Sequence, residues 1–141
     1  MTVELTPEVS GRLTDDHFGW LTTVARSGLP VPRLIWFYFS APATGSELSI
    51  YTMPSAAKVG HVRRHPQVSL NLDSDGQGGG IIVVGGTARI DAEGVDCRDD
   101  EPYWAKYAAV AEQAELTDAM ANYSTRLTIS IDKVWTTPTE A

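Results

Sequence analysis

The segment at residues 48–72, LSIYTMPSAAKVGHVRRHPQVSLNL, predicts a strand, a helix and a second strand in succession. Its first five residues are rich in β-forming side chains, and Pro54 ends that strand because proline lacks the amide hydrogen that a strand ladder needs. Ser55 is a favourable N-cap for a helix, which Pro66 then ends. The last six residues alternate between polar and apolar side chains, as in a strand with one buried face.

The same segment has an unusual distribution of charge. The chain carries a net charge of -7, yet residues 48–72 contain Lys58, Arg63 and Arg64 and no acidic residue. Lys58 lies about one turn inside the predicted helix, where a cation faces the positive end of the helix dipole. Free amide groups at a helix start, together with a lysine, can bind a phosphate or a carboxylate, which would explain that placement. The local sequence taken alone favours the simpler interpretation, a solvated lysine on an ordinary helix.

The composition is that of one domain with an ordinary core. The chain is 43% hydrophobic and 21% charged, and we expect residues 1–141 to form a single domain. The 18 acidic residues outnumber the 11 basic ones, which argues against a general nucleic-acid-binding protein. No apolar run reaches the roughly 20 residues of a membrane span, and the first residues do not resemble a signal peptide. With a single cysteine, Cys97, no internal disulfide can form, so we expect a cytoplasmic protein.

Strand patterns recur along the chain. The sequence predicts strands over residues 21–26, 31–39, 48–52, 67–72, 81–90 and 126–135. The second of these is unusually aromatic and almost continuously apolar, which predicts burial on both faces, or of one face against a partner or ligand. Gly85 and Gly86 predict a bulge, or a place where another group packs against bare backbone. Because short turns connect most neighbours, we predict a mainly β (α+β) fold, a six-stranded antiparallel sheet closed into a small barrel.

Helix and loop signals lie between the strands. Thr6 is a predicted N-cap with proline behind it, residues 102–113 have helical spacing, and Thr117 opens another helix. A turn at residues 14–16 is expected to direct three side chains inward, those of His17, Phe18 and Trp20. Residues 73–80, DSDGQGGG, predict a hairpin loop, since they lack the Gly-Lys-Ser/Thr ending of a phosphate-binding loop. Residues 91–101 carry six acids and one arginine and predict a solvated surface connection.

The sequence shows no catalytic group of its own. His61 and His65 are four residues apart on a predicted helix and could share a metal, but no third ligand is evident, which favours surface or interface histidines. Cys97 lies in an acidic segment, which does not lower the pKa of a thiol. Adjacent acids such as Asp15 and Asp16 do not converge on one substrate. We therefore predict no metal site and name no catalytic residue, so that a cofactor would carry any redox chemistry.

Several short motifs occur in an order that resembles a known family. They are Arg33-Leu-Ile-Trp36, Tyr51-Thr52, Ser55-Ala-Ala-Lys58, Arg64-His-Pro66 and Val68-Ser-Leu70. Together they resemble the pyridoxamine 5'-phosphate oxidase-like split-barrel family, over roughly residues 18–90. The short chain and the Trp-rich second strand are most similar to actinobacterial members that use the deazaflavin coenzyme F420. The resemblance implies a split β-barrel with short flanking helices that forms a homodimer, with a flavin or deazaflavin in a groove between the two barrels.

The resemblance also assigns cofactor contacts by position. Lys58 would hold the cofactor phosphate, helped by Ser55 and the start of its helix. Alanine at position 57 replaces an arginine that is frequent in the family, so phosphate binding would also draw on Arg63 or Arg64. The ring system would be lined by Arg33, Leu34, Ile35 and Trp36, with the backbone of Tyr51 and Thr52 alongside it. The facing strand of the other subunit would contribute at Gly80 and Ile81.

Two departures from the family argue against oxidation of vitamin B6. The glutamine that touches the flavin in the true oxidases is replaced around Gly80, and the C-terminal Trp and Arg motif that grips pyridoxamine phosphate is missing. The leading hypothesis is an F420-dependent oxidoreductase that transfers a hydride between the deazaflavin and an unidentified small organic substrate. An FMN-binding oxidoreductase on the same scaffold is the first alternative. A carrier of F420 or flavin without turnover is the second, because the sequence offers no convincing acid or base.

Overall fold

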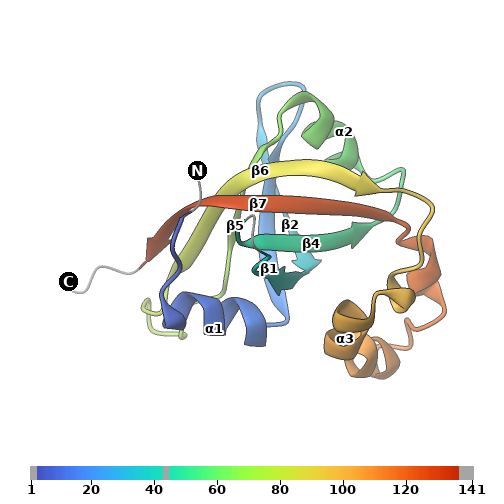
Figure 1. The fold of residues 1–141 in the computed structure, drawn as a ribbon. Helices are drawn as coiled ribbons and strands as arrows, with labels where there is room; N and C mark the ends of the chain where they lie inside the picture. Colours follow the sequence, from blue (N-terminus) through green and yellow to red (C-terminus); the bar gives the residue numbers. More distant parts are fainter. Residues whose placement is uncertain (1–2, 43–44, 137–141) are drawn as a thin grey trace.

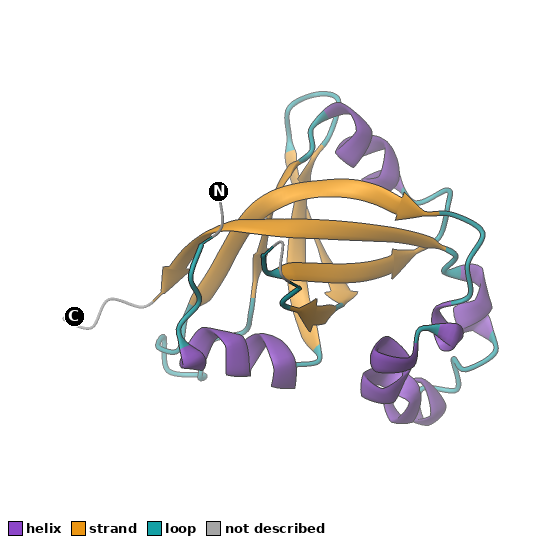
Figure 2. Cartoon of the chain, in the orientation of Figure 1, coloured by secondary structure: helices purple, strands orange, loops and turns teal. Residues whose placement is uncertain are grey.

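The computed structural model describes residues 3–42 and 45–136 (Figure 1). The strands are β1 (Phe18–Val24), β2 (Pro30–Trp36), β3 (Tyr38–Ser40), β4 (Glu47–Thr52), β5 (Gln67–Asn71), β6 (Ile82–Ala92) and β7 (Thr125–Thr136). The α-helices are α1 (Pro7–Asp15), α2 (Ala57–Arg64) and α3 (Glu101–Gln113), and the short 3-10 helices are η1 (Cys97–Asp99) and η2 (Ala119–Asn122). Strands dominate and helices flank them, as Figure 2 shows, so the fold is mainly β with α+β character.

All the described strands belong to one antiparallel sheet. Their order is β2-β1-β5-β6-β7-β4-β3. The two edge strands, β2 and β3, are consecutive in the chain and only Phe37 separates them. The sheet must therefore curl until its first and last strands meet at this residue (Figure 1). The predicted antiparallel barrel is present in outline, but its hydrogen-bonded ladder is left open between β2 and β3.

The predicted strand at residues 31–39 is two strands, so the described sheet has seven strands and not six. The break falls at Phe37, a fully buried residue whose amide donates to the Tyr107 hydroxyl 2.7 Å away. The same hydroxyl lies 2.7 Å from the Phe37 carbonyl oxygen and 2.6 Å from that of His17. A side chain of α3 therefore satisfies backbone groups that a ladder would otherwise satisfy. Of the two alternatives predicted for this segment, burial of both faces is wrong for β2, in which only Ile35 is buried within this chain, whereas burial of one face against a partner or ligand stays a prediction.

The start of the chain confirms one prediction and corrects another. Thr6 caps α1, and its hydroxyl oxygen accepts a hydrogen bond from the Val9 amide at 3.3 Å. The predicted turn that would point three aromatic side chains inward is absent, because α1 leads directly into β1. Side chains alternate along a strand, so Phe18 and Trp20 point outward and are 39% and 40% exposed. His17 is exposed as well.

The main hydrophobic core fills the inside of the curl. The predicted alternation of residues 67–72 is confirmed, since Val68, Leu70 and Leu72 are all buried. α1 packs its buried Val9 and Leu13 into the same core and covers one end of the curled sheet (Figure 1). This core fixes the positions of the strands from which the site described below is built.

Residues 93–124, between β6 and β7, form a second and smaller core with β4. Its buried members are Tyr51, Cys97, Tyr103, Tyr107, Ala111 and Met120. Burial raises the pKa of the Cys97 thiol to about 11, so this cysteine is a packing residue. The prediction of a solvated connection over residues 91–101 is therefore wrong around Cys97, whereas the helix predicted at residues 102–113 is confirmed as α3. No helix in residues 3–42 and 45–136 has the length and apolar character to cross a membrane.

The two glycine-rich stretches have local structural roles. In the loop at residues 73–80, the Asp75 carboxylate accepts hydrogen bonds from the amides of Gln77 at 2.8 Å and Gly79 at 3.0 Å. In β6, the register against β7 shifts between Gly85 and Gly86, which confirms the predicted bulge. The extra residue lies on the partner strand, where Asp132 has no paired Cα.

Candidate functional site

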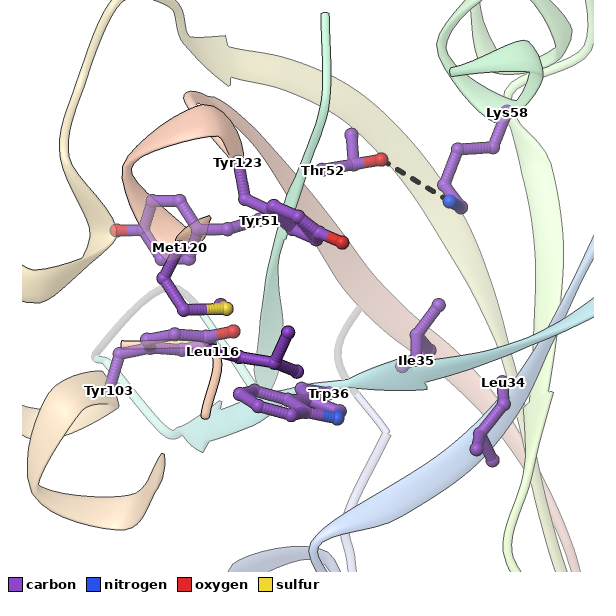
Figure 3. Close-up of a pocket in the computed structure, with 10 residues that line it drawn as sticks. All are labelled: Leu34, Ile35, Trp36, Tyr51, Thr52, Lys58, Tyr103, Leu116, Met120 and Tyr123. Atoms are coloured by element: carbon purple, nitrogen blue, oxygen red, sulfur yellow. Dashed lines mark hydrogen bonds between the residues drawn. The ribbon is translucent and has the colours of Figure 1, made fainter. Parts of the chain in front are cut away.

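Two cavities share the side chain of Lys58. The first has a volume of about 250 Å³, and it lies between β2 and β4 on one side and the inserted residues 93–124 on the other (Figure 3). Its lining residues are Leu34, Ile35, Trp36, Tyr51, Thr52, Lys58, Tyr103, Leu116, Met120 and Tyr123. The second has a volume of about 270 Å³, and its lining residues are Thr23, Val31, Arg33, Ala56, Ala57, Lys58 and His61. One space is thus mainly aromatic and apolar, the other is cationic, and a single lysine joins them.

The structure brings together seven of the eleven residues that the sequence assigned to a cofactor site. Six of them line the first cavity, and Arg33 joins Lys58 in the second. Four lie outside both cavities, namely Ser55, Arg64, Gly80 and Ile81. The cap prediction for Ser55 is wrong, because Ala56 occupies the N-cap of α2 and makes no side-chain cap, which leaves Ser55 exposed in the preceding turn.

Gly80 and Ile81 follow the loop between β5 and β6, which lies at the end of the barrel beside α1 and away from α2 (Figure 1). The Gly80 carbonyl oxygen accepts a hydrogen bond from Arg12 at 3.0 Å, and Ile81 is 41% exposed. A single chain does not bring these residues to Lys58. Their predicted role depends on a second subunit and stays a prediction, as does the predicted role of the exposed Arg64.

The cationic end of the site carries charge that nearby acids do not neutralise. Lys58 donates a hydrogen bond to the Thr52 hydroxyl at 3.2 Å, as Figure 3 shows. Burial, and secondly the positive charge of Arg33, lower the pKa of Lys58 below its ordinary value. Among the described residues, no carboxylate forms an ion pair with either cation. Beside them begins α2, where the Val59 amide donates to the Ala56 carbonyl oxygen and, among the described residues, the Ala57 and Lys58 amides have no partner within the helix. This arrangement of like charges favours an anion such as a phosphate.

His61 lies on the wall of the cationic cavity. It belongs to α2, and its Nδ1 is 2.8 Å from the hydroxyl of Thr23 on β1. His65 is exposed at the end of α2. Within the part of the chain that the structure describes, no group of three or more His, Cys, Asp or Glu side chains is placed to hold a metal.

The aromatic end of the site is held by hydrogen bonds outside the cavity. The Tyr51 hydroxyl donates to Asp100 at 2.6 Å, and Asp100 also caps α3. Burial, with this hydrogen bond second, raises the pKa of Tyr51 to about 12, so the phenol stays protonated. Tyr51 meets the ring of Tyr103 edge to face at 4.6 Å. Trp36 is stacked on Tyr107 at 5.0 Å, which fixes one wall of the cavity against α3.

Sequence reasoning missed the wall that the inserted segment supplies. Tyr103, Met120 and Tyr123 have the helical spacing of inward-facing residues, and that signal predicts packing without saying what the residues face. Leu116 carries no such signal. The contact of these residues with β2 and β4 depends on how residues 93–124 fold back, which is tertiary information.

The outer face of β1 and β2 is apolar beside the first cavity. Phe18 pairs with Trp36 across the two strands, and Trp20 pairs with Leu34. Phe18, Trp20 and Leu34 are 39%, 40% and 51% exposed. Leu34 and Trp36 also line the cavity, so this surface, here called the outer apolar face, continues into the site. Exposed apolar patches of this kind mark surfaces that bind a protein or a ligand.

The sequence matches the model of one protein family. A family model described as Pyridoxamine 5'-phosphate oxidase matches residues 5–137. No curated protein sequence matches the chain.

Solved structures of similar fold include proteins of different names. A conserved hypothetical protein from Mycobacterium tuberculosis has a TM-score of 0.65 and 20% identity, with 94% of this chain and 84% of that chain covered. An F420 reductase has a TM-score of 0.64 and 19% identity, with 92% and 98% covered. An FAD-binding protein from Mesorhizobium loti has a TM-score of 0.59 and 23% identity, with 92% of each chain covered. At these identities the similarity shows a shared fold.

Proposed function

Because the chain belongs to the pyridoxamine 5'-phosphate oxidase family over residues 5–137, we propose that it is an oxidoreductase that binds coenzyme F420. The short chain and the Trp-rich second strand are most similar to those of F420-using members, and an F420 reductase is among the structures that share the fold. The bound deazaflavin would exchange a hydride with a small organic substrate. FMN is the alternative cofactor, and it is supported by the FAD-binding protein that shares the fold.

The observation that carries this proposal is the position of Lys58 between the two cavities. Flavins and deazaflavins combine a planar ring system with a phosphate-bearing tail. The first cavity offers flat apolar side chains to a ring, and the second offers two cations and the start of α2 to a phosphate. The residues present therefore fit such a cofactor, with Lys58 and Arg33 at the anionic end and Leu34, Ile35 and Trp36 along the ring.

The protein's own contribution to the reaction would be binding and orientation. Lys58 and Arg33 fix the charged end of the ligand, while the aromatic wall limits how the ring can lie and excludes water. None of the residues that line the first cavity is an acid or a histidine. The proposal therefore assigns no side chain as an obligatory acid or base, and this same fact favours the second alternative, a cofactor carrier without turnover.

We also propose that the working form is a homodimer. The outer apolar face adjoins the first cavity through Leu34 and Trp36, so a second protomer on that face would add a wall to the site. The predicted contribution of Gly80 and Ile81 from the other subunit would then become possible.

Titration of the purified protein with F420 and with FMN tests the cofactor assignment directly. We expect F420 to bind more tightly than FMN. We expect Lys58→Ala to lower the affinity for the preferred cofactor by about ten- to a hundredfold, because a charge-assisted contact is lost. Lys133→Ala is the matched control, since it removes the same charge from an exposed site on β7. Equal affinities for wild type and Lys58→Ala would remove the phosphate role of Lys58. No binding of either cofactor would refute the proposed function.

Carrier and enzyme are separated by a second measurement. Reduced cofactor bound to the protein is mixed with a panel of quinones, enones and imines, and its reoxidation is followed by absorbance. Reoxidation faster than that of the free cofactor supports an enzyme. If the bound cofactor is reoxidised no faster with any acceptor, the carrier is the better description.

A further inference from the structure

Two tyrosine hydroxyls in the first cavity lack a protein partner. Figure 3 shows the Tyr103 and Tyr123 hydroxyls directed into the cavity, whereas the Tyr51 hydroxyl points away from it, toward Asp100. Tyr103 is only 1% exposed, and Tyr123 is half-buried. In residues 3–42 and 45–136, neither of these two hydroxyls forms a hydrogen bond with the protein. Neither is a fully buried unpaired atom, because the Thr125 hydroxyl is the one such side-chain atom of the described residues, so both hydroxyls reach the open space of the cavity.

A ligand that fills this cavity displaces solvent from both hydroxyls, and a hydroxyl left without a partner beneath a ligand is costly, so the ligand is expected to supply that partner. Burial raises the pKa of Tyr103 above its ordinary value, so the group remains a protonated hydrogen-bond donor at neutral pH. A donor at this place calls for an acceptor oxygen on the ligand. Lys58 and Arg33 favour an anion at the cationic end of the site, whereas apolar side chains surround Tyr103 and favour a neutral acceptor oxygen there.

The rest of the wall selects the shape of the ligand. Met120 and Leu116 are drawn beside Tyr103, and Trp36 is drawn next to Leu116 (Figure 3). A thioether, a leucine and an indole present polarizable apolar surface without charge. The volume of about 250 Å³ is close to the lower end of the range for ligand pockets, which suits a compact, flat ring system.

We propose that the Tyr103 and Tyr123 hydroxyls form a hydrogen-bonding site for a carbonyl oxygen on a planar conjugated ring. This hydrogen-bonding site rests on the proposed function, because the first cavity is taken as the place where a ring system binds. The carbonyl belongs either to the cofactor ring or to the substrate, and these two sources share the same chemistry. Tyr103 is thereby a ligand-contacting residue, and Tyr51, in the same wall, is a positioning residue held by Asp100.

The test begins with cofactor-free protein and two bicyclic probes. Chromone carries a ring carbonyl, and naphthalene has a similar shape without oxygen. Binding is measured by calorimetry or by chemical-shift titration. We expect Tyr103→Phe to weaken chromone binding by about five- to tenfold and to leave naphthalene unchanged. Tyr123→Phe should weaken chromone binding to a smaller extent, since its side chain is less buried and solvent competes.

Tyr38→Phe is the matched control, because Tyr38 packs against the same second core without lining either cavity. Circular dichroism and melting temperature check that each variant is folded. If Tyr103→Phe does not fold, Tyr123→Phe still tests the proposal. The chromone measurement needs no cofactor, so its result stands even if neither F420 nor FMN binds and the proposed function fails.

Titration of the same variants with F420 and FMN identifies the source of the carbonyl. If the affinity of the cofactor for Tyr103→Phe is lower than for the wild type, the site binds the carbonyl of the cofactor ring. If the cofactor affinity is unchanged and the chromone affinity is lower, the site binds the carbonyl of the substrate. The proposal is overturned if neither chromone nor cofactor affinity changes in Tyr103→Phe and Tyr123→Phe, or if naphthalene loses as much affinity as chromone.

Discussion

Lys58 is a lysine that the fold makes costly to charge. Its side chain is half-buried, and loss of solvent is the largest cause of its lowered pKa. The charge that lowers this pKa further is another cation, Arg33. A protein with 18 acidic residues has many ways to neutralise two cations, yet no acid of the described chain pairs with them. The simplest physical account is that an anionic ligand completes the site. The sequence alone favoured a solvated lysine, because burial and the position of Arg33 are visible only in three dimensions.

The lowered pKa of Lys58 leads to a prediction about pH. The protonated form binds an anion, so cofactor affinity should be full at neutral pH and should fall as the pH rises through a value below 10.5. The affinity should begin to fall at a lower pH than it would with a lysine of ordinary pKa. Affinity of the cofactor measured between about pH 7 and pH 10 checks this. Lys58→Arg is the control, because a guanidinium keeps its charge throughout this range and should flatten the profile. Identical profiles for both proteins would show that another group controls binding.

At the scale of elements, the strand break at Phe37 decides where the site opens. A continuous strand over residues 31–39 would carry β2 straight on, whereas the break lets β3 turn to pair with β4 on the other edge of the sheet. Tyr107 of α3 holds this break through both backbone groups of Phe37. The aromatic run at residues 36–39 reads as one strand because each residue has a high strand propensity. The partner that interrupts it is 70 residues away in the chain.

The glycine pair of β6 gives a prediction at the same scale. A Cβ on Gly86 would collide with the Ser130 carbonyl oxygen, which is backbone and cannot move aside. A Cβ on Gly85 would come within 3.1 Å of the Trp135 ring, which is 47% exposed and can turn. We expect Gly86→Ala to lower the free energy of unfolding by about 2–3 kcal/mol and Gly85→Ala by less than about 1 kcal/mol. Urea unfolding of both variants measures the difference. Equal losses would mean that the bulge relaxes around a methyl group.

The structure of some segments can be predicted from the sequence better than that of others. Residues 48–72 are predictable, since their strand, helix and strand follow from proline positions and from the alternation at Val68, Leu70 and Leu72. The first contacts of the site are predictable only through family motifs. The inserted residues 93–124 are the least predictable part, because helical spacing reveals Tyr103 and Met120 as inward-facing and does not reveal the cavity that they face.

For the whole molecule, a site open to one side raises the question of what covers it. Gly80 and Ile81 line neither of the cavities that Lys58 joins, and the outer apolar face leaves Trp20 and Leu34 exposed next to the first cavity. Both observations have one explanation if two chains pack with these faces together. Burial of exposed aromatic side chains would supply the association energy, at about 25 cal/mol for each Å² of apolar surface.

Substitution on this face should separate the protomers. We expect the wild-type protein to sediment as a dimer and Trp20→Ser to shift toward monomer at micromolar concentration, because Trp20 is a large aromatic at the centre of the outer apolar face. Trp135→Ser is the matched control, since it removes the same side chain, 47% exposed, from the far end of β7. If the groove between protomers forms part of the site, Trp20→Ser should also lose cofactor affinity at concentrations where it is monomeric. A wild-type monomer, or a dimer that only Trp135→Ser dissociates, would place the subunit contact elsewhere or remove it.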